Sequence, residues 1–350
     1  MSLSENEENE KHHKISSSSC CLFRYQGGKQ AIARQIADHI ENYRVNKEQV
    51  YFEPFVGAGS VLSTVSGKRI GSDLCEDLIL LHNECLEGTF QPLNYPSFHE
   101  NEDTSKQIEL AKKEETIRKK IYQEYAKKEP SAIRAHIGFG WSYSGIFFGG
   151  YSSFEERKTK KKGRTNLKDY RPRSAYFHTL KYQEHLQKSK EDIQFIHGSY
   201  LDFEPHGLII FCDPPYKGTR KYNRKEFISF NFWKTMERWV KDNVVLITEY
   251  TCPSSSLKVF EEIVDFKMGS NMQGKNKGFI KLFVNKNRNN VKHYTISDGQ
   301  QLIYKNENVL FSFYDKTKKE NNYSLKRKTN HNDNNILDYF QVKRIKNIHQ

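Results

Sequence analysis

The segment FCDPPYKGTRKY, residues 211–222, places a carboxylate, two prolines and an aromatic ring directly after the apolar run GLII. Because proline fixes φ and lacks an N–H, Pro214 and Pro215 are predicted to end a strand in a stiff extended turn. Open α/β sheets bind ligands at the carboxyl ends of their strands, where this turn is predicted to lie. Asp213 and the Pro214 carbonyl supply two hydrogen-bond acceptors there, and Tyr216 supplies an aromatic face. These groups could hold an amino group and a flat ring, although a proline turn that only ends a strand is the simpler alternative.

A second motif, YFEPFVGAGSVL, is a predicted buried strand followed by Gly57-x-Gly59. Glycine lets the backbone approach a nucleoside closely, because it has no side chain to hold the ligand off. The third glycine of dinucleotide-binding loops is replaced by Leu62, which favours an adenosine ligand without phosphates. Asp73 ends the next predicted strand, where a carboxylate can accept hydrogen bonds from both ribose hydroxyls. Taken singly, the glycines fit a tight turn and Asp73 fits a helix N-cap; together they favour a nucleoside site.

These groups suit methyl transfer to the exocyclic amine of a nucleobase. The amine is a poor nucleophile because its lone pair is delocalised into the ring, and acceptors on its protons would localise that lone pair. Tyr216 offers a face for a base rotated out of a duplex. In-line displacement from a sulfonium depends mainly on positioning, so neither a metal nor a covalent intermediate is predicted.

Four segments in this order, FRYQGGK, YFEPFVGAGSVL, SDL and FCDPPY, resemble those of the Dam-like, α-class, adenine-specific DNA methyltransferases. The resemblance covers roughly residues 22–284, and CDPPYKGT, ITEYTCP, GKNKGFIKLFV and GFGWSYSGIFFGGY are most similar to a phage or viral branch. It implies an α/β fold with a Rossmann-like methyltransferase sheet and an inserted, mainly helical target-recognition lobe. It also implies S-adenosylmethionine as cofactor and the N6 amine of a flipped adenine in duplex DNA as acceptor.

The resemblance also implies roles for individual residues. The Gly-Gly-Lys segment would lie over the methionine end of the cofactor, with Lys29 facing its carboxylate. The implied cofactor-binding residues are Tyr25, Gly28, Lys29, Glu53, Pro54, Phe55, Gly57, Gly59 and Asp73. Many relatives carry an acid-aromatic pair before the catalytic strand for the adenine ring of the cofactor. In GSYLDF, Asp202 with Phe203 fits this pair best, and Tyr200 is an alternative. Asp213, Pro214 and Tyr216 would hold the target adenine.

Charge favours a polyanionic partner. Lys and Arg outnumber Asp and Glu by 56 to 43, a formal net charge of +13, although a solvated basic surface is the alternative. Nine of these basic residues fall within residues 157–173, which suits contacts with DNA phosphates. The candidate DNA contacts are Arg157, Lys160, Lys161, Lys162, Arg164, Arg171 and Arg173, and the arginines could also read guanine. The preceding glycine-aromatic stretch, residues 137–154, is predicted either to wedge into the base stack or to form the packed core of the lobe.

The chain is predicted to contain four regions. Residues 1–19 form a disordered leader; 20–88 and 190–284 form the catalytic domain; 89–189 form the target-recognition insertion; 285–350 form a C-terminal extension. The extension should hold a hairpin-like pair around HYTI and NVLFSFY, followed by a disordered tail. Within the insertion, a long charged helix ending before Pro130 should bury Ile117, Ile121 and Tyr125.

The cysteines lack a metal-binding or disulfide spacing, and no segment is suited to a membrane. These features predict an intracellular, soluble protein.

The C-terminal segment HNDNNILDYFQVKRIK has Ile336, Tyr339 and Phe340 on one face of a predicted helical turn. It resembles the PCNA-interacting box of clamp-binding proteins, with Asp333 in place of the usual Gln. One alternative for residues 333–340 is a packed C-terminal helix. The other is a nuclear-targeting tail formed with the basic residues that follow. Clamp binding would place the protein in the nucleus or at a viral replication site.

Two other functions compete with DNA adenine methylation. An RNA adenine methyltransferase is one; Asp rather than Asn at position 213 and the Dam-like motif order count against it. The second is a catalytically silent DNA-binding module with a methyltransferase fold. A silent site has no physical reason to retain Lys29, Gly57, Asp73, Asp213 and Tyr216 together.

Overall fold

The computed structural model describes eight stretches of the chain: residues 20–93, 103–154, 170–216, 227–267, 279–288, 300–304, 309–313 and 341–344. The leader 1–19 and most of the tail lie outside these residues. So do most of the basic segment and the expected clamp-binding residues.

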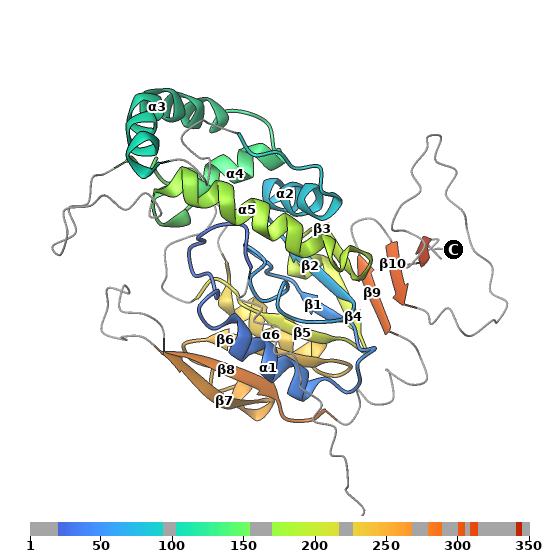
Figure 1. Cartoon of the computed structure of the whole chain (residues 1–350). Coiled ribbons are helices and arrows are strands. Elements are labelled where there is room, and N and C mark those ends of the chain that lie inside the picture. The colour runs from blue at the N-terminus through green and yellow to red at the C-terminus, as the bar shows by residue number, and fades with distance from the viewer. Residues whose placement is uncertain are drawn as a thin grey trace, which may run out of the picture.

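The main sheet is built from strands β1 (Tyr51–Glu53), β2 (Arg69–Asp73), β3 (Ile193–His197), β5 (Ile209–Cys212), β6 (Val244–Glu249), β7 (Phe260–Lys267) and β8 (Phe279–Asn285). Their order is β3-β2-β1-β5-β6-β8-β7 (Figure 1). Neighbours from β3 to β6 are parallel, whereas β8 runs antiparallel to both β6 and β7. The expected strands at YFE, RIGSD, LIIFC and VVLITE therefore form one mostly parallel sheet, whose carboxyl ends meet at one edge.

The sheet is buried on both faces, because alternate side chains of each strand enter different cores. On one face, Tyr51, Ile209 and Leu246 pack with α1 (Ala33–Tyr43), α2 (Glu76–Glu87) and α5 (Arg171–Gln187). On the other face, Phe52 and Ile210 pack with α6 (Ser229–Trp239). The apolar residues Ile36 and Ile40 of α1, with Ile32 just before the helix, are buried against the sheet. The helix α2 ends at Gly88, which adopts the left-handed conformation (φ 75°) expected of a C-cap.

The insertion is mainly helical, as predicted. It contains α3 (Thr104–Tyr125), α4 (Ala132–Gly140) and α5, which gather with α2 above the sheet in Figure 1. The glycine-aromatic stretch packs as core: Trp141 is 1% exposed, and Phe139 stacks on Phe23 and Phe147 with ring centroids 5.6 and 4.6 Å apart. This core is continuous with that of the sheet, because α4 and α5 both pack against α2.

The expected apolar face of the long charged helix is wrong at Ile117, which is 55% exposed. The face of α3 that turns inward instead carries Ala111, Arg118 and Tyr122, all buried. A buried guanidinium needs partners, and Arg118 finds them in Glu114 and the hydroxyl of Tyr170. A pattern of apolar residues cannot reveal the buried face of α3, because the largest buried side chain on it, that of Arg118, is charged.

A second, four-stranded sheet joins the C-terminal extension to the catalytic domain. Its strands are β4 (Phe203–His206), β9 (Gln300–Tyr304), β10 (Val309–Phe313) and β11 (Gln341–Arg344), in the order β11-β10-β9-β4. The expected hairpin exists around NVLFSFY, but the strand that pairs with it is β9. The run HYTI, residues 293–296, lies outside the described residues.

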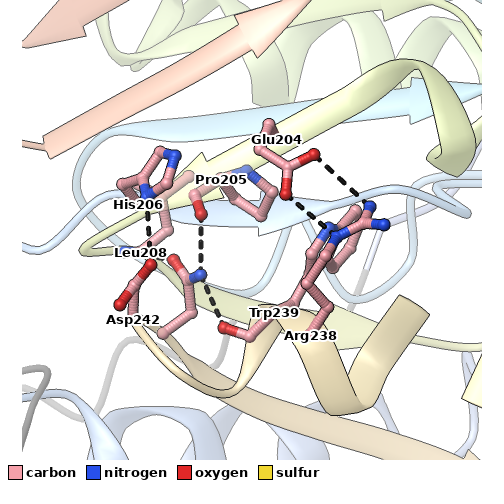
Figure 2. Close-up of polar contacts among 8 residues, drawn as sticks. Glu204, Pro205, His206, Leu208, Arg238, Trp239 and Asp242 are labelled. Carbon is pink, nitrogen blue, oxygen red and sulfur yellow. Dashed lines mark hydrogen bonds and ion pairs between the residues drawn. The ribbon is translucent and has the colours of Figure 1, made fainter. Parts of the chain in front are cut away.

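Strand β4 is fastened to the end of α6 by polar contacts (Figure 2). Arg238 pairs with Glu204 at 3.0 Å, and His206 Nδ1 lies 3.2 Å from Asp242. The buried amide of Asn243 donates to the carbonyls of Pro205 and Trp239, both at 2.8 Å. These contacts fix the position of the second sheet against the first.

Candidate active site

Four carboxylates lie at the carboxyl ends of adjacent parallel strands. Glu53 ends β1, Asp73 ends β2, Asp213 follows β5, and Glu249 ends β6. The predicted motifs therefore share one edge of the sheet, although they are far apart in the chain. That edge is the position at which open α/β sheets bind ligands.

Asp213 accepts hydrogen bonds from three side chains. Its Oδ2 lies 2.5 Å from Nζ of Lys29, while its Oδ1 accepts from the hydroxyls of Tyr216 (2.8 Å) and Thr248 (2.7 Å). Lys29 is 3% exposed and also donates to the carbonyl of Gly27 at 2.7 Å. These donors fix the orientation of the carboxylate.

The position of Lys29 differs from the expectation that it faces the carboxylate of the cofactor. A buried ammonium requires a counterion inside the protein, and Asp213 supplies it. The predicted residue therefore belongs to the site, but it contacts the acidic residue of the DPPY segment.

The Tyr216 ring stands between the ammonium of Lys29 and a second aromatic ring. Its centroid lies 5.0 Å from Lys29 Nζ and 4.8 Å from the centroid of Tyr250, whose plane is tilted by 67°. Burial, reinforced by the charge of Asp213, raises the pKa of the Tyr216 hydroxyl well above its ordinary value. Tyr216 therefore stays a neutral hydrogen-bond donor to Asp213.

The glycine loop after β1 is held by Asp73. Gly57 adopts a left-handed conformation (φ 49°), and its N–H donates to Asp73 Oδ2 at 3.1 Å. The other oxygen, Oδ1, accepts from the N–H of Cys75 at 2.9 Å. Cys75, and not Asp73, is the N-cap residue of α2, and no side chain caps this helix. Burial raises the pKa of the Asp73 carboxyl, and the two N–H donors oppose that rise.

The segment that contains Tyr25 lies against the same loop. A Cβ at Gly57 would lie 3.1 Å from Cε1 of Tyr25, so the tyrosine ring fills the space that a side chain would need. The turn is closed by the N–H of Gly28, which donates to the carbonyl of Tyr25 at 3.0 Å. Tyr25 therefore packs against Gly57, and Gly28 lies in the same turn as Tyr25.

Glu53 ends β1, and Phe55 follows it before the glycine loop. Glu53 is 3% exposed, and its Oε2 accepts from the Tyr51 hydroxyl at 2.7 Å. Burial raises the pKa of Glu53 well above its ordinary range, with the negative charge of Asp213 adding to the rise. After the buried Pro54, the half-buried ring of Phe55 lies 5.3 Å from that of Tyr200.

The expected acid-aromatic pair is wrong at Phe203. Its side chain is fully buried in the second core, packed edge-on against Phe52 at 5.4 Å, and it cannot reach a ligand. Asp202 accepts from the N–H of Ser199 at 2.7 Å in a capping box. The alternative aromatic, Tyr200, directly follows β3 and packs beside Phe55. Phe203 is the first residue of β4, and its side chain points from this strand into the core.

Only part of the candidate DNA contacts lies within the described residues. Arg171 and Arg173 are in the first turn of α5, and the guanidinium of Arg173 lies 4.6 Å from the ring of Phe177. The remaining candidate DNA contacts, Arg157, Lys160, Lys161, Lys162 and Arg164, lie outside the described residues, as do Ile336, Tyr339 and Phe340.

Sequence reasoning missed two groups at the site. Thr248 interrupts the apolar run of β6 near its carboxyl end, and a hydroxyl in that position could have been noticed. His82 lies in the apolar middle of α2, and its Nε2 is 2.8 Å from the carbonyl oxygen of Gly57. No local signal connects a histidine in a helix with a glycine 25 positions earlier.

Two possible features are not found among the described residues. They contain no cluster of three or more histidine, cysteine or acidic side chains able to hold a metal. No helix in the same part of the chain is long and apolar enough to span a membrane.

The strand order and the ligand-binding edge define a Rossmann-like methyltransferase fold. Residues 25–250 match the model of the D12 class N6 adenine-specific DNA methyltransferases, and the chain belongs to this family. Membership implies S-adenosylmethionine as methyl donor and DNA adenine as acceptor.

Solved structures of similar arrangement include the rRNA methyltransferase AviRa from Streptomyces viridochromogenes. Two of its structures are 11% and 10% identical to this chain, with TM-scores of 0.30 and 0.33. They cover 72% and 75% of this chain, which in turn covers 84% and 86% of theirs. These TM-scores are too low to support an argument. No curated protein matches the chain.

Proposed function

We propose that this protein methylates adenine in duplex DNA at its exocyclic nitrogen, with Asp213, Pro214 and Tyr216 holding the flipped base. The observation that carries the proposal is the Asp213 carboxylate, held by Lys29, Tyr216 and Thr248 at the carboxyl end of β5. An oriented acceptor at this edge suits an amine that must enter in one geometry.

The residues of the glycine loop fit the adenosine portion of S-adenosylmethionine. The left-handed Gly57 has no side chain to hold a ligand off, and the ring of Tyr25 lies against the position that a Cβ would take. Asp73 takes the ribose hydroxyls, and Tyr200 with Phe55 supplies the apolar surface for the adenine ring, with Asp202 adjacent. When bound, the cofactor supplies a methyl group on a positively charged sulfur.

The chain's own residues orient the acceptor. Asp213 and the carbonyl of Pro214 accept the two N–H bonds of the adenine amine, which localises its lone pair toward the methyl group. Methyl transfer to N6 would exchange the S–C bond of the cofactor for the new N–C bond and leave a neutral thioether. The surplus proton on N6 leaves along its hydrogen bond to Asp213. Tyr216 packs against the base and keeps it in the plane of these acceptors.

The recognition role falls to the helical insertion and its basic segment. The positive charge of residues 157–173 suits phosphate contacts, and Arg171 and Arg173 begin α5. Within the glycine-aromatic stretch, Tyr143 is 66% exposed, whereas the other aromatic rings are buried or half-buried, so Tyr143 is the ring suited to enter the base stack. The DNA sequence that is recognised would follow from sequencing the methylated DNA of cells that express this chain.

The test of the proposal is methyl transfer from labelled S-adenosylmethionine to DNA or RNA, with digestion of the product to nucleosides. Label is expected in N6-methyladenine from DNA. Label in RNA only, or none in DNA of any sequence, would contradict the proposal. The Asp213→Ala variant should lose transfer and keep DNA binding; loss of both would indicate misfolding.

A clamp-binding role for the C-terminal tail also belongs to this proposal. Ile336, Tyr339 and Phe340 have the spacing of a PCNA-interacting box, and basic residues follow them. Clamp binding would place the protein at a nuclear or viral replication site, in keeping with the resemblance to a viral branch. A peptide of residues 330–350 should bind PCNA in calorimetry, and the same peptide with alanine at 339 and 340 should not. Absence of binding by the first peptide would contradict this role.

A further inference from the structure

A buried histidine bridges the cofactor loop and the insertion. His82 is fully buried; its Nε2 lies 2.8 Å from the Gly57 carbonyl, and its Nδ1 lies 3.0 Å from the Tyr182 hydroxyl. A carbonyl can only accept, so Nε2 carries the proton. Nδ1 is therefore the acceptor, and the Tyr182 hydroxyl donates to it. The two hydrogen bonds define the tautomer of the ring and the direction of the chain Tyr182 to His82 to Gly57.

The ring of His82 is held in place from its face as well as its edges. It stacks on Phe195 of β3 with ring centroids 4.3 Å apart and planes within 15°. Burial lowers the pKa of His82 to about 4, so the imidazole is neutral at physiological pH and keeps one donor and one acceptor. A neutral, immobile imidazole can hold a backbone carbonyl without bringing a charge to the loop.

The same tyrosine also supports the second glycine of the loop. A Cβ at Gly59, whose φ is 75°, would lie 2.2 Å from the Tyr182 hydroxyl oxygen. Nothing larger than glycine fits above this hydroxyl. Tyr182 therefore contacts the loop twice, directly at Gly59 and through His82 at Gly57.

Both backbone polar groups of Gly57 are thus held by side chains. Its N–H donates to Asp73, and its carbonyl accepts from His82. The left-handed conformation of this residue, which glycine adopts freely, is therefore fixed by hydrogen bonds to both of its backbone polar groups.

Further contacts connect α5 to the neighbourhood of this loop. Thr179 donates to the carbonyl of Leu22 at 2.9 Å, and the N–H of Leu22 donates to the carbonyl of Ala58 at 3.1 Å. His185 Nε2 lies 2.7 Å from the carbonyl of Ser63. Thr179, Tyr182 and His185 are spaced by three along α5 and occupy one face of the helix.

We propose that His82 and Tyr182 are positioning residues of the cofactor loop, which hold Gly57 and Gly59 in the conformation that receives S-adenosylmethionine. Neither side chain touches the reacting atoms; Tyr182 orients His82, and His82 holds the Gly57 carbonyl. The proposal rests on the proposed function of the loop as the cofactor site. It deepens that function by making a helix of the insertion a structural part of cofactor binding.

The test uses the full-length protein and two matched substitutions of the histidine. Glutamine places its amide nitrogen near the position of Nε2, so His82→Gln keeps a donor to Gly57. Asparagine places its amide near the position of Nδ1, so His82→Asn keeps a partner for Tyr182 and leaves the Gly57 carbonyl without its donor. Tyr182→Phe removes the hydroxyl alone. The control is Tyr122→Phe, which removes another buried hydroxyl bond of the insertion, that to Ser142, without contacting the loop.

The dissociation constant of S-adenosylmethionine should rise about ten-fold in His82→Asn and several-fold in Tyr182→Phe. His82→Gln should restore most of the affinity lost in His82→Asn, and Tyr122→Phe should match the wild type. In steady state, KM for the cofactor should rise while kcat at saturating cofactor and the affinity for DNA stay unchanged. A general packing defect would instead lower the melting temperature of all four variants, without a rise in KM for the cofactor at unchanged kcat.

Two outcomes overturn the proposal. If His82→Asn and Tyr182→Phe bind S-adenosylmethionine as the control does, while Asp73→Ala loses binding, the cofactor site stands and the positioning role is wrong. If Asp73→Ala also binds normally, the loop is not the cofactor site, and the proposed function of the loop fails with it.

Discussion

Lys29 and Asp213, separated by 184 positions in the chain, form a buried ion pair with Nζ and Oδ2 2.5 Å apart. The lysine is 3% exposed and the aspartate side chain 19% exposed. The pair joins the segment before α1 to the turn after β5. The same carboxylate also receives hydroxyls from Tyr216 and Thr248, so one acidic group organises the centre of the site.

Replacing Lys29 by methionine should abolish most activity and destabilise the fold. The change leaves a buried carboxylate without its counterion, which costs about 3 kcal/mol of the free energy of unfolding. Methyl incorporation should fall on the order of 100-fold, because Asp213 loses its fixed orientation. In the double variant Lys29→Met/Asp213→Asn, urea denaturation should recover part of the lost stability while activity stays absent. No recovery would show that the two residues are not coupled.

The two functions of Tyr216 can be separated by two substitutions. Tyr216→Phe keeps the ring and removes the hydrogen bond to Asp213, so kcat should fall only about ten-fold. Tyr216→Ala also removes the face against which the base packs, and the loss should be at least ten-fold larger. Single-turnover methylation of a DNA duplex distinguishes them. Equal losses in the two variants would contradict a packing role for the ring.

Stability should decrease as the pH falls below about 6.5. Burial lowers the pKa of His82 to about 4 and that of His136 to about 3, from an ordinary value of 6.5. Between these values the unfolded chain binds more protons than the folded one, so each histidine lowers the free energy of unfolding by up to about 1.4 kcal/mol per pH unit. The loss of stability runs from pH 6.5 down to 4 for His82 and down to 3 for His136.

A substitution at His136 checks this pH dependence. Its Nδ1 lies 3.1 Å from the Thr179 hydroxyl, and His136→Asn keeps a donor near that nitrogen while removing the titration. Urea denaturation at a series of pH values should show a weaker dependence of the free energy of unfolding on pH than in the wild type. If the free energy of unfolding depended on pH as strongly as in the wild type, other groups would cause the acid sensitivity.

Gly59→Ala should be destabilising for two physical reasons. The new Cβ would lie 2.2 Å from the Tyr182 hydroxyl, and alanine is strained at a φ of 75°. The free energy of unfolding should fall by about 3 kcal/mol. Adding Tyr182→Phe removes the clashing oxygen, so the double variant should lose less stability than the sum of the single variants. Thermal unfolding measures both, and strict additivity would contradict the contact.

The basic segment should account for part of the salt dependence of DNA binding. Each lysine that neutralises a phosphate contributes about 0.9 to the slope of log affinity against log salt concentration. Replacing Lys160, Lys161 and Lys162 by glutamine should therefore reduce the slope by about 2 to 3 and weaken binding to all sequences alike. Fluorescence anisotropy with a duplex at several salt concentrations gives the slope. A change in sequence preference without a change in slope would assign these lysines to base recognition.

Local patterns were enough to predict the class of chemistry. The order of Gly57, Gly59, Asp73 and the DPPY segment, each after an apolar run, placed them at strand ends, and the parallel sheet brought those ends together. The predictions from sequence were wrong where contacts between elements decide whether a side chain is buried. Phe203 carries an aromatic signal suited to a ligand, but pairing of β4 with β9 makes it core. Ile117 looks apolar in the pattern, but the buried face of α3 holds Arg118.

The sequence by itself determined the chemical groups of this protein and their order, because turn residues and strand ends are encoded within a few positions. Only the tertiary structure decided their partners. The contacts of Lys29 with Asp213, of Thr248 with Asp213, and of His82 with Gly57 and Tyr182 cross between elements. Long-range contacts of this kind depend on how elements pack and twist, and no spacing in the sequence records that.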